Sequence, residues 1–352
     1  MEARGRKKVG VVGYGTMGKW HQDKLGKSGV AEVVAIYDID PEKYEAPEAA
    51  PLKKCANLGE LLSLSLDFVI VATPNDTHKG ISIKAIETGK HVLCEKPAAM
   101  NARELEDVLK AAESKGRVFS VHQNRRWDRD FRIVKKVYDE RILGAPFFIE
   151  SRMQGSNGIP GDWRTKKAFG GGMLMDWGVH LIDQILWMVK SPVVEAYSQV
   201  LRIKSEECDD QVKAMMRFEN GVNTLVEVNT FSLIPEWRWH FCGEYGSFYI
   251  DDIMHCGGSM RKLNPVIRPA AGGAIAESGP TRTFAPRSPD TYTDLPLPGD
   301  VETDYLNLYR NFVDACEGGE LIVKPAESLR VMRLIDVLFE CAEKGVSFKG
   351  RL

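Results

Sequence analysis

The stretch that decides the fold is KVGVVGYGTMG at residues 8–18. A short apolar run at residues 8–13 leads directly into a glycine-rich turn, and a helix-like segment follows it. The GxGxxG spacing suits a turn that joins a strand to a helix and lets a pyrophosphate approach the amides at the helix start. The candidate cofactor-binding residues of this turn are Gly13, Gly15, Thr16, Met17 and Gly18.

An acidic residue stands where dinucleotide-binding proteins hold the ribose. Asp38 comes 20 residues after Gly18, at the end of the second predicted strand, where a carboxylate accepts the ribose 2′-hydroxyl. The same charge repels a 2′-phosphate, and no arginine follows it immediately. We therefore expect NAD as cofactor, with NADP less favoured. If Asp38 only starts a turn with Asp40-Pro41, the choice between the two stays open.

The first part of the chain alternates short apolar runs with helix-like segments, which is typical of a parallel sheet wrapped by crossover helices. We expect an α/β Rossmann domain over residues 1–124 that binds NAD. The predicted strands are residues 8–13, 33–37, 67–72, 91–94 and 118–122, and the predicted helices are residues 17–28, 58–64, 77–88 and 101–115.

Beyond residue 124 the pattern changes to strands with period-two alternation and few crossovers. We expect an α+β domain over residues 125–352 for substrate binding and oligomerisation, with a large, mostly antiparallel open sheet. The predicted strands are residues 147–154, 193–203, 211–218, 222–231, 238–242 and 247–251, with one long helix over Met173–Val189. Residues 256–298 show no clear period, and the helices predicted at residues 304–317 and 326–344 have room to pack back on the first domain.

Composition narrows the class of protein. The 352 residues carry 47 Lys+Arg against 49 Asp+Glu, without the concentrated basic face that nucleic acid requires. The seven cysteines are scattered and have no zinc-ligand spacing, which favours a reducing compartment. No stretch has the length of apolar residues that a membrane span needs. We expect a cytoplasmic protein with no nucleic-acid or membrane partner.

A second motif, Glu95-Lys96-Pro97, follows the predicted strand at residues 91–94. Ligands of α/β proteins collect at the carboxyl ends of such strands, so Lys96 is placed to hold a substrate oxygen or pass a proton near the cofactor. A solvated lysine at a strand end is the alternative interpretation.

The third motif is GGGMLMDWGVHLID at residues 170–183. On a regular helix Asp176 and His180 are four residues apart and share a face, so the carboxylate can orient the imidazole as a general base. Activity in the oxidising direction should then rise with pH through an imidazole-like transition. Asp176, His180 and Asp183 have the spacing of metal ligands, but we expect no metal, and a histidine buried in the core for structural reasons is the other alternative.

Together these motifs resemble the Gfo/Idh/MocA family of glucose-fructose oxidoreductase, inositol dehydrogenase and their relatives. The resemblance extends through residues 72–78, 89–97 and 170–183 and covers most of the first domain. It implies NAD-dependent hydride transfer with Lys96, Asp176 and His180 as the catalytic triplet. In that scheme His180 takes the hydroxyl proton, Asp176 orients His180, and Lys96 holds the substrate oxygen.

The resemblance also carries over binding residues. Those implied at the nicotinamide and ribose are Thr73, Pro74, Asn75, His78, Glu95 and Lys96, with Asn124 and Arg125 close to the cofactor. Those implied at the substrate are Lys96, Arg125, Trp163, Arg164, Asp176 and His180. An aromatic face and charged donors suit a sugar ring and its hydroxyls.

The expected function is hydride exchange between nicotinamide and a secondary alcohol or ketone of a sugar, glycoside or cyclitol. Two alternatives remain: an NAD-dependent glycosidase that acts by transient oxidation and elimination, and a non-catalytic regulator that senses NAD or a sugar. A homodimer or homotetramer is also expected, because a sheet covered on one face leaves an apolar face to be buried. Val222, Leu225, Val226 and Val228 belong to strands that could supply that face.

Overall fold

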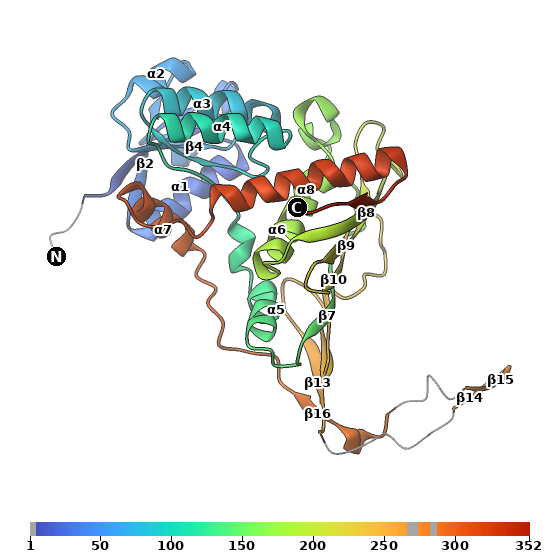
Figure 1. Ribbon diagram of the computed structural model, residues 1–352. Helices are drawn as coiled ribbons and strands as arrows, with labels where there is room; N and C mark the ends of the chain where they lie inside the picture. Colours follow the sequence, from blue (N-terminus) through green and yellow to red (C-terminus); the bar gives the residue numbers. More distant parts are fainter. Residues whose placement is uncertain (1–4, 266–273, 282–286) are drawn as a thin grey trace.

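The N-terminal part of the chain folds into a parallel sheet wrapped by helices (Figure 1). The computed structural model describes residues 5–265, 274–281 and 287–352. The strand order β3-β2-β1-β4-β5-β6 is that of a dinucleotide-binding fold, with its topological switch between β1 and β4. The strands are β1 (Lys7–Val12), β2 (Ala31–Tyr37), β3 (Lys53–Lys54), β4 (Phe68–Val71), β5 (His91–Cys94) and β6 (Phe119–Val121).

The helices of this domain connect the strands as the sequence predicts, with ends shifted by at most one residue. They are α1 (Thr16–Ser28), α2 (Leu58–Ser63), α3 (His78–Glu87) and α4 (Ala102–Ser114). β4 consists of four apolar residues in succession, all of them buried. Such a run is typical of a parallel strand that helices cover on both faces, so the Rossmann prediction is confirmed.

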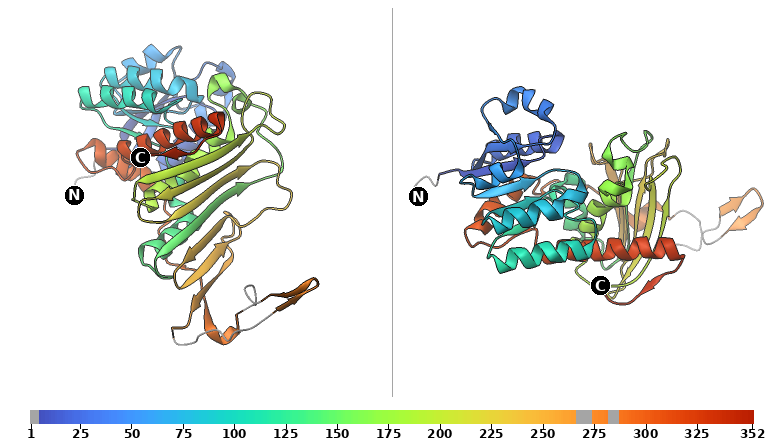
Figure 2. Two further views of the ribbon diagram at one scale, coloured as in Figure 1. Left: turned by 45° about the vertical axis from the view of Figure 1, so that its right-hand side comes forward. Right: turned by 90° about the horizontal axis from the view of Figure 1, so that it is seen from above.

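The rest of the chain forms a large open sheet with strand order β16-β13-β12-β11-β7-β10-β9-β8-β17 (Figure 2). Its pairings are antiparallel except that of β7 with β10. The alternation of exposed and buried residues along β9 marks one covered face and one open face. The strands are β7 (Pro146–Gln154), β8 (Val193–Leu201), β9 (Gln211–Phe218), β10 (Asn223–Asn229), β11 (Trp239–Gly243), β12 (Gly246–Ile250), β13 (Gly258–Leu263), β16 (Tyr292–Leu295) and β17 (Phe348–Lys349).

The helices on the covered face are α5 (Arg129–Asp139), α6 (Val179–Met188) and α8 (Pro325–Lys344), and α8 also packs against α4 of the first domain. A further helix is α7 (Leu306–Cys316). Nearly every residue of α6 is buried, which fits a helix enclosed on several sides. α7 packs back on the Rossmann domain, where the ring of Phe312 meets that of Phe68 with 5.1 Å between centroids.

The helix predicted over Met173–Val189 is confirmed, but its first part is π-helical: η7 (Leu174–Gly178) runs directly into α6. Another sequence prediction is wrong in detail. The segment 256–298, read as having no regular structure, supplies strands β13 and β16 to the sheet and a small hairpin of β14 (Ala274–Ala276) and β15 (Gly279–Thr281). Residues 266–273 and 282–286 of that segment lie outside the described residues.

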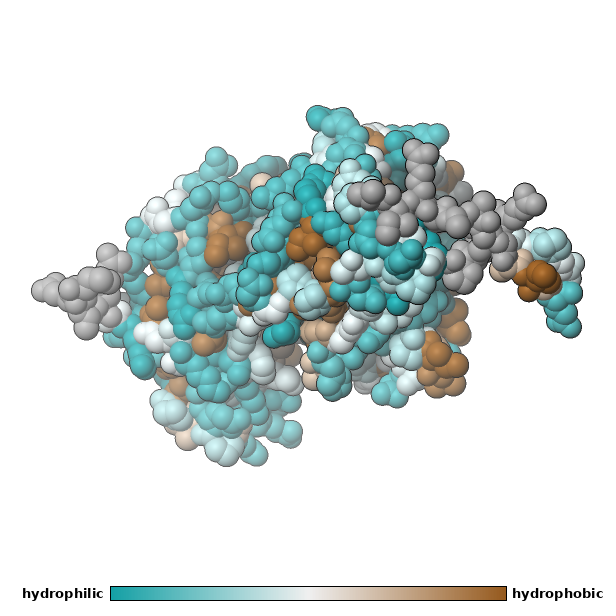
Figure 3. All heavy atoms as spheres, turned by 90° about the horizontal axis from the view of Figure 1, so that it is seen from below, coloured by the Kyte–Doolittle hydropathy of each residue, from teal (hydrophilic) through white to brown (hydrophobic). Residues whose placement is uncertain are grey.

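Most of the residues expected to supply the open face of the sheet lie on its covered face. Val222, Val226 and Val228 point to the covered side and are at most 2% exposed, because they occupy the inward positions of β10 and of the turn before it. Leu225 remains partly exposed on the open side. The molecular face in Figure 3 is mostly hydrophilic, with apolar residues in small separate patches. Among the described residues, none of the helices combines the length and apolar character that a membrane span requires.

Candidate active site

The glycine-rich turn at the end of β1 has the geometry that a bound dinucleotide needs. Gly13 has φ +89°, and a Cβ there would lie 2.5 Å from the carbonyl oxygen of Ala72. A Cβ on Gly18 would lie 2.2 Å from the carbonyl oxygen of Gly13, so the third glycine lets α1 pack closely against the turn. A Cβ on Gly15 would meet nothing within 4 Å, which leaves room for a phosphate beside the start of α1 at Thr16. These residues fit a dinucleotide.

Asp38 lies at the end of β2 and holds this turn in place. One carboxylate oxygen accepts a hydrogen bond of 2.6 Å from the amide of Tyr14, and the other accepts one of 2.9 Å from the amide of Asp40. The carboxylate is only partly buried. Asp38 therefore links the ends of β1 and β2 at the edge where a ribose would lie.

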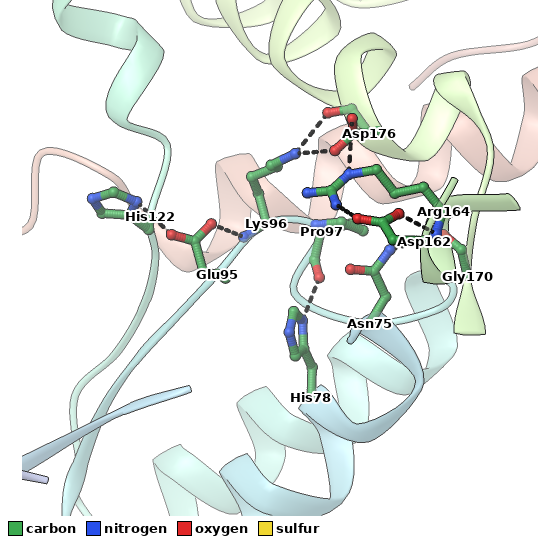
Figure 4. A network of polar contacts seen from close by, with 10 residues as sticks. All are labelled: Asn75, His78, Glu95, Lys96, Pro97, His122, Asp162, Arg164, Gly170 and Asp176. Carbon is green, nitrogen blue, oxygen red and sulfur yellow. Dashed lines mark hydrogen bonds and ion pairs between the residues drawn. The ribbon is translucent and has the colours of Figure 1, made fainter. Parts of the chain in front are cut away.

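The segment after β4 ties the Rossmann domain to the second domain. The side-chain amide of Asn75 donates a hydrogen bond of 2.8 Å to the carbonyl oxygen of Gly170 (Figure 4). The Thr73 and Thr77 hydroxyls lie 2.7 Å apart, and Pro74 precedes the short turn that Asn75 begins.

His78, which we expect at the nicotinamide, lies beneath the loops that follow β4 and β5. Its ring is fully buried, with nitrogens 2.8 Å from the carbonyl oxygens of Thr73 and Pro97, and burial lowers its pKa. His78 thus supports the two loops on either side of it.

Lys96 reaches from the end of β5 across to the second domain. Its ammonium donates hydrogen bonds of 2.8 Å to both the carboxylate Oδ1 and the backbone carbonyl of Asp176 (Figure 4). Arg164 approaches the other carboxylate oxygen at 3.3 Å. Burial alone would raise the pKa of Asp176, but the charges of Lys96 and Arg164 outweigh burial and hold that pKa below its usual range.

His180 lies four residues after Asp176, at the start of α6, and is 5% exposed. Its ring meets the edge of Trp177 with 5.9 Å between centroids, and among the described residues its Nδ1 has no hydrogen-bond partner. Burial, followed by the charges of Lys96 and Arg125, lowers the pKa of His180 well below the ordinary imidazole value. A buried neutral imidazole with an unpartnered nitrogen is suited to accept a proton from a substrate hydroxyl.

The expected pairing of Asp176 with His180 is not what the structure shows. Within the described chain the Asp176 carboxylate contacts Lys96 and Arg164, and it is not among the causes of the shift at His180. The physical reason is the π-helical turn, which changes the angular relation between positions 176 and 180 from that of a regular helix. Asp176 therefore orients the ammonium of Lys96.

Asp209 anchors the turn that carries Asp176. Its carboxylate accepts a 2.7 Å hydrogen bond from the amide of Leu174, and its backbone carbonyl accepts one of 2.9 Å from Met173. Gly172 has φ +105°, and a Cβ there would lie 2.2 Å from an Asp209 carboxylate oxygen. Burial raises the pKa of Asp209 to about 6.

The segment between the two domains, η4 (Asn124–Trp127), places Arg125 against Trp177, the ring that also meets His180. The guanidinium of Arg125 lies 4.4 Å above the ring of Trp177 and forms a 3.0 Å ion pair with Asp128. Asn124 is half-buried beside it.

The next residue, Arg126, is fully buried and binds both carboxylate oxygens of Asp183 at 2.7 and 2.8 Å. Its Nη1 also reaches Glu327 at 2.7 Å. Asp183, which has the spacing of a metal ligand, binds Arg126 instead and holds the domain junction together.

Trp163 and Arg164 lie on η5 (Trp163–Thr165), in the segment that follows β7. The guanidinium of Arg164 stacks 4.6 Å over the Trp163 ring and pairs with Asp162 at 2.6 Å. Arg164 joins the Lys96–Asp176 pair directly, while Trp163 is half-buried next to it.

Glu95, which we expect beside the ribose, has three partners within the chain. Oε1 lies 3.0 Å from Nε2 of His21 and 2.9 Å from Nδ1 of His122, and Oε2 accepts a 3.2 Å hydrogen bond from the amide of Lys96. Burial would raise the pKa of Glu95, but the two imidazoles hold it well below the usual carboxyl value. His21, His122 and Asp209 were not foreseen, because their motifs carry no spacing that distinguishes them.

The site thus brings together Lys96, Asp176, His180, Arg125 and Arg164 from both domains, at the carboxyl edge of the Rossmann sheet. A dinucleotide-binding turn next to a buried imidazole and a lysine–carboxylate pair defines the class of NAD-binding oxidoreductases.

Comparison with known proteins agrees with this class. Residues 7–123 match the oxidoreductase family with an NAD-binding Rossmann fold, and residues 131–249 match the GFO/IDH/MocA C-terminal domain. The chain belongs to the GFO/IDH/MocA family of oxidoreductases.

Individual relatives extend over nearly the whole chain. An NAD-binding protein from Listeria innocua is 38% identical, with a TM-score of 0.94 over 98% of this chain and 99% of that one. The scyllo-inositol 2-dehydrogenase (NADP(+)) IolW of Bacillus subtilis is 29% identical over 96% of this chain and 94% of its own length. An uncharacterized oxidoreductase of Escherichia coli, YdgJ, is 26% identical over 96% of both chains.

Proposed function

We propose that the protein exchanges a hydride between NAD and a secondary alcohol or ketone of a neutral sugar, glycoside or cyclitol. The observation that carries the proposal is the contact of Lys96, from the Rossmann domain, with Asp176, from the second domain, next to buried His180. Bound NAD would supply the hydride acceptor. The relatives named inositol 2-dehydrogenase and scyllo-inositol 2-dehydrogenase support a polyol substrate.

Each residue of the triplet has a role that follows from its contacts. His180 takes the hydroxyl proton, because its ring is neutral and one of its nitrogens has no partner among the described residues. Lys96 holds and polarises the substrate oxygen. Asp176 keeps the ammonium of Lys96 in position and, with Arg164, makes hydrogen-bonding groups available to neighbouring hydroxyls.

The charges of the site favour a neutral substrate over an anionic one. Each of three cations already has a carboxylate partner: Lys96 with Asp176, Arg164 with Asp162 and Asp176, and Arg125 with Asp128. A phosphate or carboxylate on the substrate would have to compete with these pairs, whereas hydroxyls can hydrogen-bond to them. Asn124, Arg125 and Trp163 would border the cofactor and the sugar ring.

Purified protein with NAD, tested against matched neutral and anionic compounds, examines this proposal. We expect NADH absorbance with one or more cyclitols or neutral sugars, and much less with the corresponding sugar phosphates and uronic acids. NADH formed only with the anionic set would contradict the charge argument. Release of an aglycone from glycosides without net NADH would contradict dehydrogenation as the overall reaction.

We also propose that the protein binds NAD more tightly than NADP, because the carboxylate of Asp38 lies at the end of β2. The carboxylate is only partly buried, so its charge would oppose a 2′-phosphate. The relative IolW is named for NADP, so the affinities of this protein for NAD and NADP should be compared directly. Calorimetry should give tighter binding of NAD than of NADP, and Asp38→Ala should reduce the difference between the two affinities. Equal affinity in the unmodified protein would contradict the role of Asp38.

For the organisation of the chain we propose a cytoplasmic homodimer or homotetramer, with the domain boundary between residues 124 and 125. The open face of the large sheet would form the contact, since Tyr197 and Met215 on it are 40% and 52% exposed. Light scattering at micromolar concentration should return a molar mass that is a multiple of the 39.3 kDa of one chain, and Met215→Lys should lower that molar mass. A monomer in the unmodified protein would contradict the assembly.

A further inference from the structure

We propose that Glu95, held between His21 and His122, is a specificity-determining residue that makes the protein bind oxidised NAD more tightly than NADH. The inference rests on the dinucleotide site and goes beyond the proposed substrate. Its basis is a buried polar cluster behind Lys96 that the proposed proton transfer does not use.

Four elements contribute to the cluster. His21 comes from α1, the helix that begins at the glycine-rich turn, Glu95 from the end of β5, and His122 from the end of β6. Tyr309 of α7 closes the chain of contacts, with its hydroxyl 2.9 Å from Nδ1 of His21. Both histidines are 0% exposed and Glu95 is 6% exposed, so solvent screens these groups little.

The hydrogen bonds indicate that the cluster carries one net negative charge. His21 can donate from Nε2 to Glu95 while Nδ1 accepts from the Tyr309 hydroxyl, which describes a neutral ring, and burial lowers its pKa. Nδ1 of His122 lies 2.9 Å from the Glu95 carboxylate without the geometry of a hydrogen bond, and its buried Nε2 also has no partner in the described chain. A protonated His122 would bury a second N–H without an acceptor, which is the costlier arrangement.

The ammonium of Lys96 does not neutralise Glu95. Lys96 reaches the Glu95 carboxylate with its backbone amide, at 3.2 Å, because its ammonium is committed to Asp176 (Figure 4). At His180, Glu95 raises the pKa against the larger effects of burial, Lys96 and Arg125, and His122 lowers it slightly. Glu95 is therefore within electrostatic reach of the reaction centre.

This charge distinguishes the two states of the cofactor. Glu95 ends a strand at the carboxyl edge of the sheet, where the nicotinamide of a dinucleotide-binding fold is held. The oxidised ring is positively charged and the reduced ring is neutral, so a buried carboxylate stabilises the oxidised form selectively.

The three side chains also lie close enough to be considered for a metal ion. Both nitrogens, however, approach a single oxygen of Glu95 at 2.9 and 3.0 Å, and the contact with His21 is an ordinary hydrogen bond. A buried carboxylate that accepts a hydrogen bond from His21 is therefore the arrangement that the distances favour.

Glu95→Gln tests the proposal, since it keeps the size of the side chain and removes the charge. We expect NAD affinity, measured by calorimetry, to fall about tenfold while NADH affinity, measured by fluorescence, stays within about twofold. Glu150→Gln is the matched control, because Glu150 also contacts a histidine, His240 at 3.0 Å, but lies on the open sheet. It should leave the ratio of the two dissociation constants unchanged.

Equal losses of affinity for NAD and NADH would leave the ratio of the two dissociation constants unchanged. That result would mean that Glu95 is only structural, and it would overturn the proposal. If neither cofactor binds the unmodified protein, the dinucleotide site itself fails, which is a separate result. Should the variant not fold, nitrogen-15 NMR of histidines in the unmodified protein decides: neutral rings for His21 and His122 near about pH 7 support the inference. A doubly protonated His122, or a stoichiometric divalent metal found by elemental analysis, would overturn it.

Discussion

Removing the charge of Arg125 tests the assignment of His180 as the base. Burial, Lys96 and Arg125 together lower the pKa of His180, so its neutral, proton-accepting form predominates down to a pH below the ordinary imidazole range. In the unmodified protein, kcat/KM for alcohol oxidation should rise with pH in a limb that ends below about pH 6.5. Arg125→Gln should move that limb upward, because loss of a nearby positive charge raises the pKa of His180.

The structure sets the size of the shift. The Arg125 guanidinium lies 4.4 Å from the Trp177 ring centroid, and that centroid lies 5.9 Å from the His180 ring. The two charges are therefore at most about 10 Å apart, which gives ~1.7 kcal/mol at an effective dielectric constant of about 20. Asp128 and partial solvent exposure reduce this by roughly half, so the limb should move by about 0.6 pH unit.

The assay is the pH dependence of kcat/KM at saturating NAD with the best substrate found. Arg117→Gln is the control, because Arg117 is exposed near the opposite end of β6 and should leave the limb in place. A limb that stays fixed in Arg125→Gln, or moves to lower pH, would refute the electrostatic reasoning. A limb above pH ~6.5 in the unmodified protein would refute the lowered pKa of His180.

Three further variants test other parts of the site. Lys96→Met removes the ammonium that contacts Asp176 and holds the substrate oxygen. We expect kcat/KM to fall by about 10²- to 10⁴-fold while NAD affinity changes little, and a retained kcat/KM would contradict the role of Lys96. Asn75→Ala breaks the hydrogen bond to Gly170 and should raise KM with kcat nearly unchanged, at a cost of about 1 kcal/mol in the free energy of unfolding; an unchanged KM would show that this tether does not shape the substrate site. Arg126→Ala strands the buried carboxylate of Asp183 and should lower the free energy of unfolding by about 3–5 kcal/mol in denaturant titrations; a loss below about 1 kcal/mol would contradict the importance of this pair.

The Rossmann half was predictable because its signals are local. The GxGxxG turn, Asp38 and the strand that precedes Lys96 each follow from short runs of sequence, and the structure has them where the alternation of apolar runs implied. The family resemblance was confirmed over both domains.

The contacts of the site were harder to foresee because they depend on tertiary geometry. Regular helix spacing predicts a contact between Asp176 and His180. Because of the π-helical turn, Asp176 instead accepts a hydrogen bond from Lys96, 80 residues earlier in the chain. The partners of Glu95 likewise come from positions 21 and 122, and no local pattern joins them. Strands β13 and β16 were missed because they lie in a segment rich in Gly, Pro, Ser and Thr, where the sheet imposes a structure that the local sequence does not favour.

The central claim is that the site moves a hydride from a carbon of a neutral polyol to NAD. Mass spectrometry of the cofactor after turnover with a polyol deuterated at its secondary carbons measures this transfer directly. The account predicts one deuterium in the NADH formed, and a strong loss of labelled NADH in His180→Ala with NAD binding retained. NADH without deuterium, or undiminished labelling in His180→Ala, would contradict it.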